Sequence, residues 1–389
     1  MNVMATGQGT ASRKPLAGVR VLDLGIITAG AATSALLADL GAEVIKVESP
    51  TYRDPFRIWV PQRPEDRDKL SPHFRATNRG KRSVALNVKE AEGRECLLRL
   101  AERCDVVVEN FRRGVMDKLG VGFEILKARN PDIVLASISS QGETGPDALY
   151  VSYGSTLESM GGMAWLTGYA GGPPLVSGVD LNYPDQVVAI LAAGTVCAAL
   201  QQVRSGGGAV HLDISQRELT SFLISDAFGA ESPENPRIGN ADPEFWLQDC
   251  FPAQDGRWVA VSVPHERKAA FEEVTDGVEA ASWFSRRRAD DAADALAHAG
   301  IPTSVSLPGE EVLAARQWRT ALFTGADGQP LKGTPFALDG AEAQPAEIAA
   351  FGADTIAVLR EIGGFTEAEI AALQAKGVVV AEEDALATV

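Results

Sequence analysis

The carboxylate of Asp185 poses the sharpest chemical question in this sequence. It lies in the stretch NYPDQVVAILAAG, residues 182–194, between Pro184 and a long apolar helical run. Proline fixes the backbone at the first turn of a helix, and an aspartate beside it commonly caps the free N–H groups there. A carboxylate held at that position could instead act as a covalent nucleophile. The residues alone leave both interpretations open.

Two clusters of cations lie next to expected strand ends and could hold a phosphate. They are NRGKRS (78–83) and ENFRRG (109–114), each of which combines glycine and asparagine with lysine or arginine. Lysine and arginine bind phosphate through charge-assisted hydrogen bonds, and glycine lets backbone N–H groups approach. Each cluster alone is typical of a solvated loop. Because two such clusters are expected at one edge of the sheet, a site for a phosphorylated ligand is as good an interpretation as two solvated loops.

Other common chemistries lack their sequence patterns. No GxGxxG follows the first expected strand, whose continuation is GIITAGAATSALLADLG, and the Walker and GxSxG patterns are absent. A dinucleotide-dependent oxidoreductase is therefore the least favoured alternative. The cysteines have no CxxC spacing and no histidine stands at metal-ligand spacing, so we expect reduced thiols and no metal.

Composition narrows the class of protein. Hydrophobic residues make up 45% of the 389 residues and charged residues 23%, which is ordinary for a soluble globular protein. The net charge of -16 opposes long-range attraction to nucleic acid or acidic membranes. We find no apolar run long enough and free enough of glycine and charge to span a bilayer, and no apolar signal core at the N-terminus. We therefore expect a cytoplasmic protein with no nucleic-acid or membrane partner.

Alternating strands and helices must position these side chains. Short runs rich in valine and isoleucine predict buried strands at 19–25, 42–48, 83–88, 105–111, 132–140 and 209–215. Helical spacing is found at 29–41, 89–104, 114–130 and 186–204. This alternation predicts an α/β fold with a doubly wound, mostly parallel sheet that gathers ligands at the carboxyl ends of its strands. The proline-rich segment 49–78 is expected to be a long loop over that edge.

A change of composition marks a second domain. Residues 231–245 (ESPENPRIGNADPEF) resemble a linker, and DGRWVAVSV at 255–263 opens a unit with its own strand and helices. We expect a large domain over 1–230, completed by 330–389, and a smaller α+β domain over 240–325.

Several stretches, in order along nearly the whole chain, resemble the family III CoA-transferases (CaiB/BaiF family), the group that includes formyl-CoA transferase and the carnitine CoA-transferases. The stretches are PLAGVRVLDLGIITAG, LLADLGAEVIKVESP, NRGKRSVALNVKEAEG, DVVVENFRRGVMDKLGVGFEIL, NPDIVLASISSQGETGP and ALQQVRSGGGAVHLDIS. Each is weak alone, but the ordered set is specific. The resemblance implies a Rossmann-like large domain and an obligate dimer of interlocked rings, with the active site between the large domain of one chain and the small domain of its partner. A homodimer is expected, and a heteromer with a related chain is the alternative.

The resemblance also favours Asp185 as the nucleophile. The family's catalytic aspartate lies a fixed distance before the AAL of the following helix, here residues 198–200, and the neighbouring Asp180 is the alternative. The implied reaction moves coenzyme A from an acyl-CoA donor, such as succinyl-CoA, to a carboxylic acid through aspartyl anhydride and aspartyl-CoA thioester intermediates. Glycine N–H groups of residues 161–178 are candidate oxyanion donors. A CoA-binding subunit, or a CoA-ester lyase of the same fold, is the competing interpretation.

Further site residues follow from the resemblance. The expected CoA contacts are Ile27, Thr28 and Ala29 at the entrance, Lys81 at a phosphate, and Asn110, Phe111 and Lys118 beside the pantetheine and adenine parts. Arg57 is a further candidate cation in the loop after the second strand.

The expected substrate pocket departs from the family pattern. It contains Tyr153, Gly154 and Glu158, and Gly154 stands where the family commonly has an acidic residue. The missing side chain removes a charge and opens volume, so we expect an acid bulkier than formate or oxalate. Ser49 replaces an arginine of formyl-CoA transferase, which puts one adenine or phosphate contact in doubt.

Overall fold

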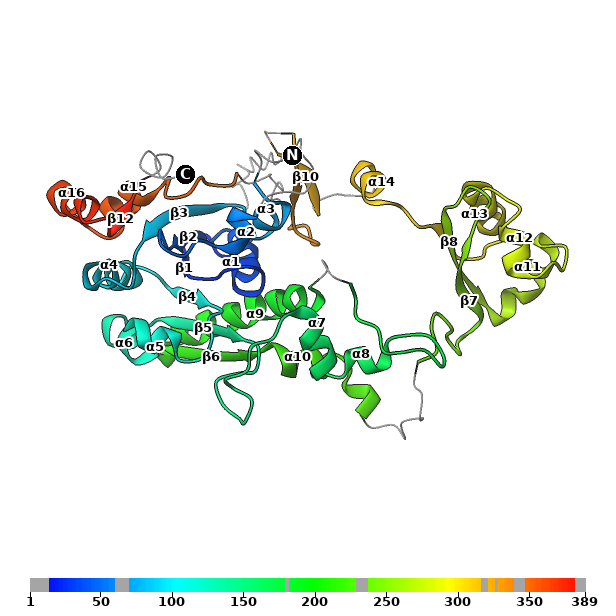
Figure 1. Ribbon diagram of the computed structural model, residues 1–389, viewed down its shortest axis with the longest axis horizontal. Coiled ribbons are helices and arrows are strands. Elements are labelled where there is room, and N and C mark those ends of the chain that lie inside the picture. The colour runs from blue at the N-terminus through cyan, green and yellow to red at the C-terminus, as the bar shows by residue number, and fades with distance from the viewer. Residues whose placement is uncertain are drawn as a thin grey trace, which may run out of the picture. The chain divides into compact units, whose positions relative to one another are not determined.

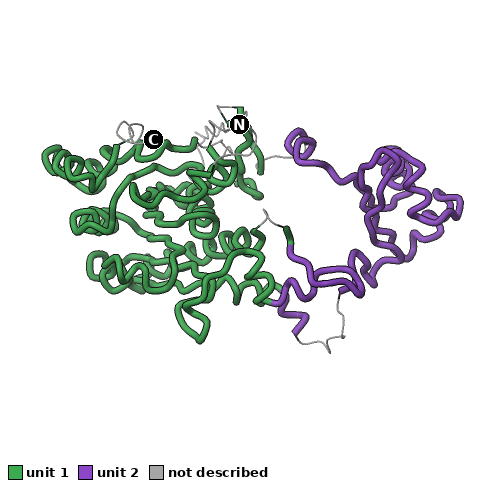
Figure 2. The backbone as a smooth tube through the Cα atoms, in the orientation of Figure 1, with its two compact units in different colours: residues 1–161, 177–223, 318–389 green, residues 162–176, 224–317 purple. Residues whose placement is uncertain are grey.

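The chain folds into two compact units. The computed structural model describes residues 14–59, 70–178, 182–228, 237–315, 321–325, 328–338 and 347–381. Unit 1 comprises residues 1–161, 177–223 and 318–389, and unit 2 comprises residues 162–176 and 224–317 (Figure 2). The segment 162–176, which we had placed in the large domain, is part of unit 2.

A seven-stranded sheet forms the centre of unit 1 (Figure 1). The strands are β1 (Arg20–Asp23), β2 (Glu43–Glu48), β3 (Lys81–Leu86), β4 (Val106–Glu109), β5 (Val134–Ser139), β6 (Val210–Ser215) and β12 (Val379–Val380). Their order is β12-β3-β2-β1-β4-β5-β6, and each neighbouring pair is parallel except β12 with β3. The predicted α/β fold with a mostly parallel sheet is confirmed.

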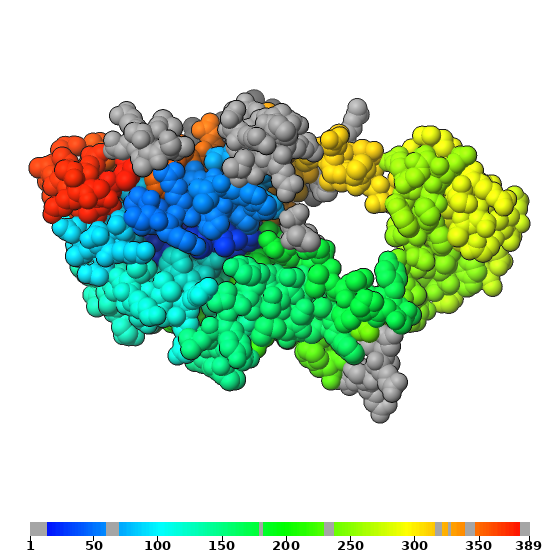
Figure 3. Space-filling model, in the orientation of Figure 1, coloured from blue at the N-terminus to red at the C-terminus, as the bar shows by residue number. Residues whose placement is uncertain are grey.

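Helices cover both faces of this sheet, which is why its central strands read as nearly continuous apolar runs. One face packs against α1 (Ala29–Asp39), α9 (Tyr183–Gln202) and α10 (Gln216–Leu223). The opposite face packs against α4 (Ala91–Ala101), α5 (Val115–Leu119), α6 (Phe123–Arg129), α15 (Thr355–Glu361) and α16 (Glu367–Ala375). Successive residues of a strand point alternately to the two faces of the sheet. In β4, Val106 and Val108 belong to the core with α1 and α9, and Val107 belongs to the core with α4. In Figure 3 the red C-terminal helices lie against the cyan of α4.

The long helix α9 corrects one expectation. By length and composition, Tyr183–Gly207, which includes the π-helical turn Val203–Gly207, could span a membrane, although we had found no such run in the sequence. In the structure Val188, Ala192 and Val196 are buried, and α9 packs along α1. Its other face exposes Ile190, so that one helix presents apolar side chains on two sides.

The predicted loop 49–78 contains two helices. They are α2 (Pro55–Ile58) and α3 (Pro72–Asn78). The side chains of Asp54 and Ser71 cap them by accepting hydrogen bonds from the backbone N–H groups of Phe56 and Phe74. A capping residue followed directly by proline is a helix-start signal that composition had obscured. The remaining helix and strands of unit 1 are α7 (Gly154–Met160) and the hairpin of β10 (Leu322–Thr324) and β11 (Pro330–Lys332).

Unit 2 has its own antiparallel sheet and core. Its strands, in the order β7-β8-β9, are β7 (Phe245–Pro252), β8 (Trp258–Pro264) and β9 (Thr303–Val305). Its helices are α8 (Met163–Leu166), α11 (Lys268–Val274), α12 (Ala280–Phe284), α13 (Ala289–His298) and α14 (Gly309–Ala314), with short 3₁₀ turns at Ser225–Phe228 and His265–Arg267. Buried aromatic side chains, among them Trp283 and Phe284, fill the core between the sheet and the helices.

Two glycines in helices of unit 1 give opposite predictions for stability. A Cβ on Gly93 in α4 would lie 1.9 Å from the backbone oxygen of Asn87, whereas a Cβ on Gly194 in α9 would meet nothing within 4 Å. We expect Gly93→Ala to lower the free energy of unfolding by about 2 kcal/mol because the backbone must shift. Gly194→Ala is expected to raise it by about 0.5–1 kcal/mol. Urea unfolding of both variants tests this, and equal stability of the two would contradict it.

Candidate active site

Asp185 lies in the first turn of α9. Asn182 precedes this helix with a left-handed backbone (φ 45°), Pro184 occupies the first turn, and the Asn182 side chain makes no capping hydrogen bond. Asparagine tolerates this backbone conformation better than most residues. Asp185 is thus the third residue of the helix and does not occupy its N-cap position. Burial raises the pKa of its carboxyl to about 6, and a hydrogen bond with its own backbone N–H opposes the shift only in part.

Gly154 lies directly against this carboxylate. It is the first residue of α7, and a Cβ there would lie 3.4 Å from Oδ2 of Asp185 and 3.0 Å from Cα of Asn182. The absence of a side chain therefore lets the start of α7 approach the start of α9. The expected neighbours Gly154 and Asp185 thus meet, whereas the alternative nucleophile Asp180 lies outside the described residues.

The other two expected pocket residues differ in how far they are exposed to solvent. Tyr153, just before α7, is 67% exposed. Glu158 is buried, and its two carboxylate oxygens accept hydrogen bonds from the backbone N–H (2.8 Å) and the hydroxyl (2.5 Å) of Ser177. In the structure Glu158 therefore fixes the chain around Ser177, and its oxygens already have partners.

The loop between β1 and α1 contains the three residues expected at the CoA entrance. Ile27 has a left-handed backbone (φ 59°), which a β-branched residue rarely adopts. Thr28 and Ala29 begin α1, and both side chains are buried. Ala29 belongs to the same buried cluster as Val188, one turn beyond Asp185 in α9.

Five side chains hold the backbone of this loop, and they come from β1, β2, the turn after β4, the start of α2, and α3. Asn110 clasps Ile26, because its Oδ1 accepts from the N–H (2.8 Å) and its Nδ2 donates to the C=O (3.0 Å). Asp23 accepts a hydrogen bond from the N–H of Gly25 (2.8 Å), and Lys46 donates one to the C=O of Gly25 (2.7 Å). For Ile27, the N–H donates to Asp54 (3.3 Å) and the C=O accepts from Thr77 (3.4 Å). The strained loop is thus fixed at each consecutive residue.

Lys81 is part of the same buried network and does not face solvent. Its Nζ donates to Asp23 (2.7 Å), to the C=O of Ala31 (2.7 Å) and to Asn78 (3.0 Å). Burial lowers its pKa to about 8, with Asp23 opposing and Lys46 reinforcing that shift. This corrects the expectation that Lys81 would face a CoA phosphate, because its three donor positions are already used inside the protein.

Arg57 is likewise committed to an internal partner. Its Nε and Nη2 donate to the two carboxylate oxygens of Glu48 at 2.7 and 2.6 Å, and its guanidinium lies 4.0 Å from the ring centre of Phe74. The bidentate geometry is the strongest that an arginine makes with a carboxylate. Arg57 therefore serves as a link between β2 and α2 and α3, and this corrects the expectation of a cation free for CoA.

The cations that do reach the surface lie after β4. Phe111 is partly buried against the core on the α4 side, and Lys118 in the last turn of α5 is exposed. Arg112 and Arg113 are exposed between them. Of the two basic clusters in the sequence, the one at 109–114 thus keeps cations that an anionic ligand could reach.

Sequence analysis missed the acids and the lysine that support the entrance loop. Asp23, Lys46 and Asp54 are each at most 2% exposed. The burial of Lys46 by itself lowers its pKa, but Asp23, Asp54 and Glu48 outweigh this effect and raise it. The signal was present in VIKVE, because a lysine inside a buried strand needs carboxylate partners.

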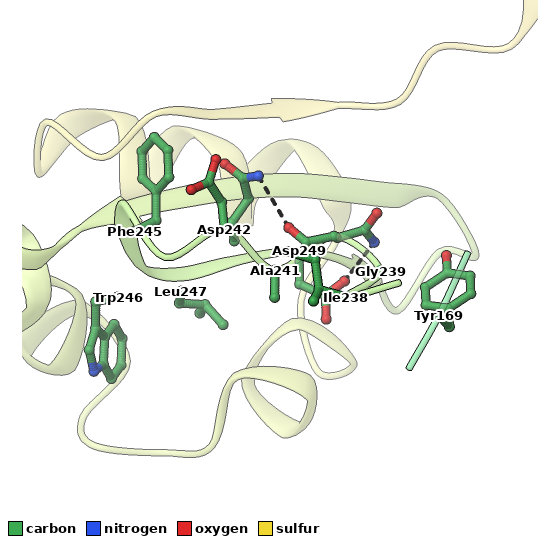
Figure 4. Close-up of a pocket in the computed structure, with 11 residues that line it drawn as sticks. Tyr169, Ile238, Gly239, Ala241, Asp242, Phe245, Trp246, Leu247 and Asp249 are labelled. Atoms are coloured by element: carbon green, nitrogen blue, oxygen red, sulfur yellow. Dashed lines mark hydrogen bonds between the residues drawn. The ribbon is translucent and has the colours of Figure 1, made fainter. Parts of the chain in front are cut away.

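A separate cavity of about 260 Å³ lies in unit 2 (Figure 4). Tyr169 lies at one end and Phe245 and Trp246 lie at the other, and the Asp249 carboxylate accepts a hydrogen bond from Asn240 (2.8 Å). Its lining has the carboxylates of Asp242 and Asp249 and no lysine or arginine. Such a lining disfavours a carboxylate ligand, and none of the expected site residues belongs to it.

Within the described part of the chain, no group of three or more histidine, cysteine, aspartate and glutamate side chains could hold a metal ion. The expectation of a metal-free site stays a prediction.

The family of this chain follows from its similarity to known proteins. Residues 16–281 match the family described as CoA-transferase family III. The chain belongs to this family. The match includes Asp185, Gly154 and the entrance loop, and it leaves the oxidoreductase alternative without support.

Related family III proteins differ in their acids. The chain is 34% identical over 250 residues to a succinate–glutarate CoA-transferase of Agrobacterium fabrum (63% of this chain, 62% of that protein). It is 36% identical over 252 residues to a succinyl-CoA–D-citramalate CoA-transferase of Chloroflexus aurantiacus (64% of this chain, 61% of that protein). The match thus spans just over three fifths of the length of these relatives.

Solved structures share the fold over a greater length. A CaiB/BaiF family protein from Brucella suis has a TM-score of 0.79 at 27% identity, with 90% of this chain and 100% of that chain covered. A hypothetical protein from Mycobacterium tuberculosis has a TM-score of 0.71 at 23% identity, with 88% and 98% covered, and shows the same fold.

The raised pKa of Asp185 predicts a pH-dependent gain in stability when its charge is removed. The folded pKa, about 6, lies above the ordinary value of 3.8, so the folded state loses stability as the pH rises from about 4 to 6. We expect Asp185→Asn to be more stable than the wild type by about 1–2 kcal/mol at pH 7.5, after allowance for partial exposure. The difference should vanish below about pH 4.

Urea unfolding of both proteins at pH 4 and pH 7.5 measures this difference. Asp132→Asn, which removes an exposed carboxylate, is the matched control and should show no such gain. A variant that is less stable than the wild type at pH 7.5 would contradict the strained, desolvated carboxylate.

Proposed function

We propose that this protein transfers coenzyme A from an acyl-CoA donor to a carboxylic acid and that Asp185 is the nucleophile. The family membership supports the class of reaction. The observation that carries the residue assignment is a half-buried carboxylate in the first turn of a helix that bonds its own backbone N–H and pairs with no cation of the described chain.

The reaction follows from the chemistry of this carboxylate. One oxygen of Asp185 attacks the thioester carbonyl carbon, the C–S bond breaks, and an aspartyl–acyl anhydride and CoA thiolate form. The thiolate then attacks Cγ of Asp185, which releases the donor acid and leaves an aspartyl-CoA thioester. The acceptor carboxylate attacks the same Cγ and displaces the thiolate, which attacks the acceptor carbonyl and restores Asp185. No water or proton is consumed.

The surroundings of Asp185 suit the first step. With a pKa of about 6 the carboxylate is mostly ionised at neutral pH, yet it has lost part of its hydration. A carboxylate is a weak nucleophile in water, so positioning and partial desolvation must supply much of the rate. A Cβ at position 154 would lie 3.4 Å from Oδ2 of Asp185, so glycine at this position leaves that side of the oxygen free of a side chain.

The relatives support succinyl-CoA as the donor and an acid larger than formate as the acceptor. Their names include succinyl-CoA with glutarate, D-citramalate and mesaconate, and acetyl-CoA with oxalate. The open position at Gly154 favours the larger acids in this group. A CoA-binding subunit whose chemistry lies in a related chain is the second candidate, because the match spans only part of the curated relatives.

A dimer is part of the proposal. Unit 1 exposes large apolar side chains, among them Tyr150 at 62%, Ile190 at 58% and Phe222 at 70%. Side chains of this size on α9 and α10 are costly to leave in water, and a second copy of the chain would cover them. The interlocked arrangement and the cytoplasmic location remain predictions on the same footing.

Intact-protein mass spectrometry tests the mechanism. Wild type and Asp185→Asn are incubated with succinyl-CoA or acetyl-CoA and then treated with hydroxylamine or borohydride. We expect a CoA-sized adduct in the wild type and, after trapping, a modification that peptide mapping places on Asp185. Asp185→Asn should show neither.

Asp132→Asn is the control, since it removes an exposed carboxylate and should still form the adduct. An adduct on another residue would refute the assignment of Asp185. Binding of CoA without any adduct, from either donor, would favour the CoA-binding subunit.

A further inference from the structure

A chain of hydrogen bonds crosses three strands on the α5–α6 side of the sheet. Glu109 ends β4 and lies opposite Ser137 of β5 in the sheet register. The Ser137 hydroxyl lies 3.0 Å from Nε2 of His211 on β6, and Ser137 is near enough to the paired Glu109 to lower the pKa of its carboxyl. The ring of His211 stacks on Phe123 at 5.1 Å. The chain therefore runs from a buried carboxylate to an exposed imidazole at the sheet edge.

Glu109 differs from the other buried acids at this end of the sheet. Asp23, Glu48 and Asp54 each pair with a lysine or arginine. Glu109 is only 4% exposed, and no lysine or arginine of the described chain lies within ion-pair distance of it. The desolvation of a buried carboxylate without a cation must be offset by hydrogen bonds or avoided by protonation.

The hydrogen bonds of Glu109 lead to the entrance loop. Its Oε2 accepts from the backbone N–H of Phe111 at 2.7 Å, a length typical of a bond to an ionised carboxylate. This bond fixes the turn that contains Asn110. The amide of Asn110 in turn clasps the N–H and C=O of Ile26, next to the left-handed Ile27. Glu109 thus sets the position of Asn110 and, through it, the β1–α1 loop.

We propose that Glu109, Ser137 and His211 form a positioning chain for Asn110 and Phe111 that makes the affinity for coenzyme A depend on pH. The inference rests on the proposed function in that coenzyme A is taken as the ligand of this loop. Glu109 itself touches no substrate in this scheme and acts through the next two residues, Asn110 and Phe111.

The chain has two proton arrangements. With Glu109 ionised, the hydroxyl of Ser137 donates to the carboxylate and Nε2–H of His211 donates to the hydroxyl oxygen. With Glu109 protonated, its O–H donates to Ser137, whose hydroxyl donates to an unprotonated Nε2. Burial raises the pKa of Glu109 to about 7, Ser137 and the N–H of Phe111 lower it in part, and Glu143 adds to the rise. The change therefore falls in the physiological range.

The charged groups around the chain are few. Glu143, in the loop after β5, receives no hydrogen bond from Arg113 but lies 3.9 Å from it. Asp213 on β6 accepts from the backbone N–H of Glu143 at 3.0 and 3.1 Å. Burial raises the pKa of Glu143, Asp213 and Asp117 add to the rise, and His211 and Arg113 oppose it. Of these charged groups, Glu143 raises the pKa of Glu109.

The sign of the effect follows from the bond to Phe111. An ionised carboxylate holds an N–H more strongly than a neutral acid does, so the loop is best ordered above pH 7. We expect the Kd of the wild type for CoA to rise about fivefold between pH 8 and pH 6 from this cause, the ratio that corresponds to the difference between a charged and a neutral hydrogen bond. Glu109→Gln should resemble the protonated wild type at each pH.

The experiment measures CoA binding by calorimetry at half-unit steps from pH 5.5 to 8.5 for wild type, Glu109→Gln, Ser137→Ala and the control Asp132→Asn. The phosphates of CoA also titrate near pH 6, so the readout is the ratio of the Kd of each variant to that of the wild type. For Glu109→Gln this ratio should be about 5 at pH 8 and near 1 at pH 6. For Ser137→Ala the midpoint of the pH dependence should move to higher pH, because the ionised form of Glu109 loses a donor.

A ratio for Glu109→Gln that is constant over this range would overturn the proposal and leave the transferase mechanism untouched. So would an unmoved midpoint in Ser137→Ala when thermal unfolding shows both variants to be folded. Binding with the expected pH dependence but no aspartyl adduct would remove the proposed function and leave the positioning chain in place. Absence of CoA binding by the wild type would overturn the proposal of a positioning chain.

Discussion

A balanced group of four buried charges supports the β1–α1 loop of the large unit. Asp23 pairs with Lys81, and Lys46 pairs with Asp54, at side-chain exposures of 2% or less. Because the two signs cancel, the group can remain buried without an unpaired charge, whose desolvation would be expensive. Its hydrogen bonds to the Gly25–Ile27 backbone hold a conformation that isoleucine does not favour. The position of the β1–α1 loop thus depends on ion pairs that are shielded from solvent.

The acids of this unit fall into two groups with opposite physical roles. Asp23, Glu48 and Asp54 are stabilised by cations and fix the loops. Asp185 and Glu109 are buried without such partners, and burial raises the pKa of each. An enzyme that needs a reactive or responsive carboxylate has to leave it incompletely compensated, which lowers stability at that place. The paired acids elsewhere keep the surrounding backbone from relaxing around the unpaired ones.

Much of the fold and the class of site could be predicted from the sequence. Apolar runs such as VRVLDLG and the helical spacing between them are local signals, and they predicted the parallel sheet. The environments of single side chains were harder. Arg57 and Lys81 have the types and neighbours of phosphate ligands, but only the folded structure shows that Glu48 and Asp23 occupy them. The helix starts at Asp54 and Ser71 had a local signal that composition obscured. The nearness of Gly154 and Asp185 joins two helices distant in sequence, which spacing alone does not reveal.

The last strand of the described chain has a consequence for biosynthesis. β12 closes the sheet by pairing antiparallel with β3, and Val358, Leu359, Ile370 and Leu373 complete the core that α4 begins. A ribosome must therefore release the whole of residues 224–317 before β12, α15 and α16, which complete this edge of the sheet and the core at α4, exist. The small unit can fold cotranslationally while one edge of the large sheet is still bare, and during that interval the growing chain depends on chaperones or on rapid synthesis to protect the exposed edge.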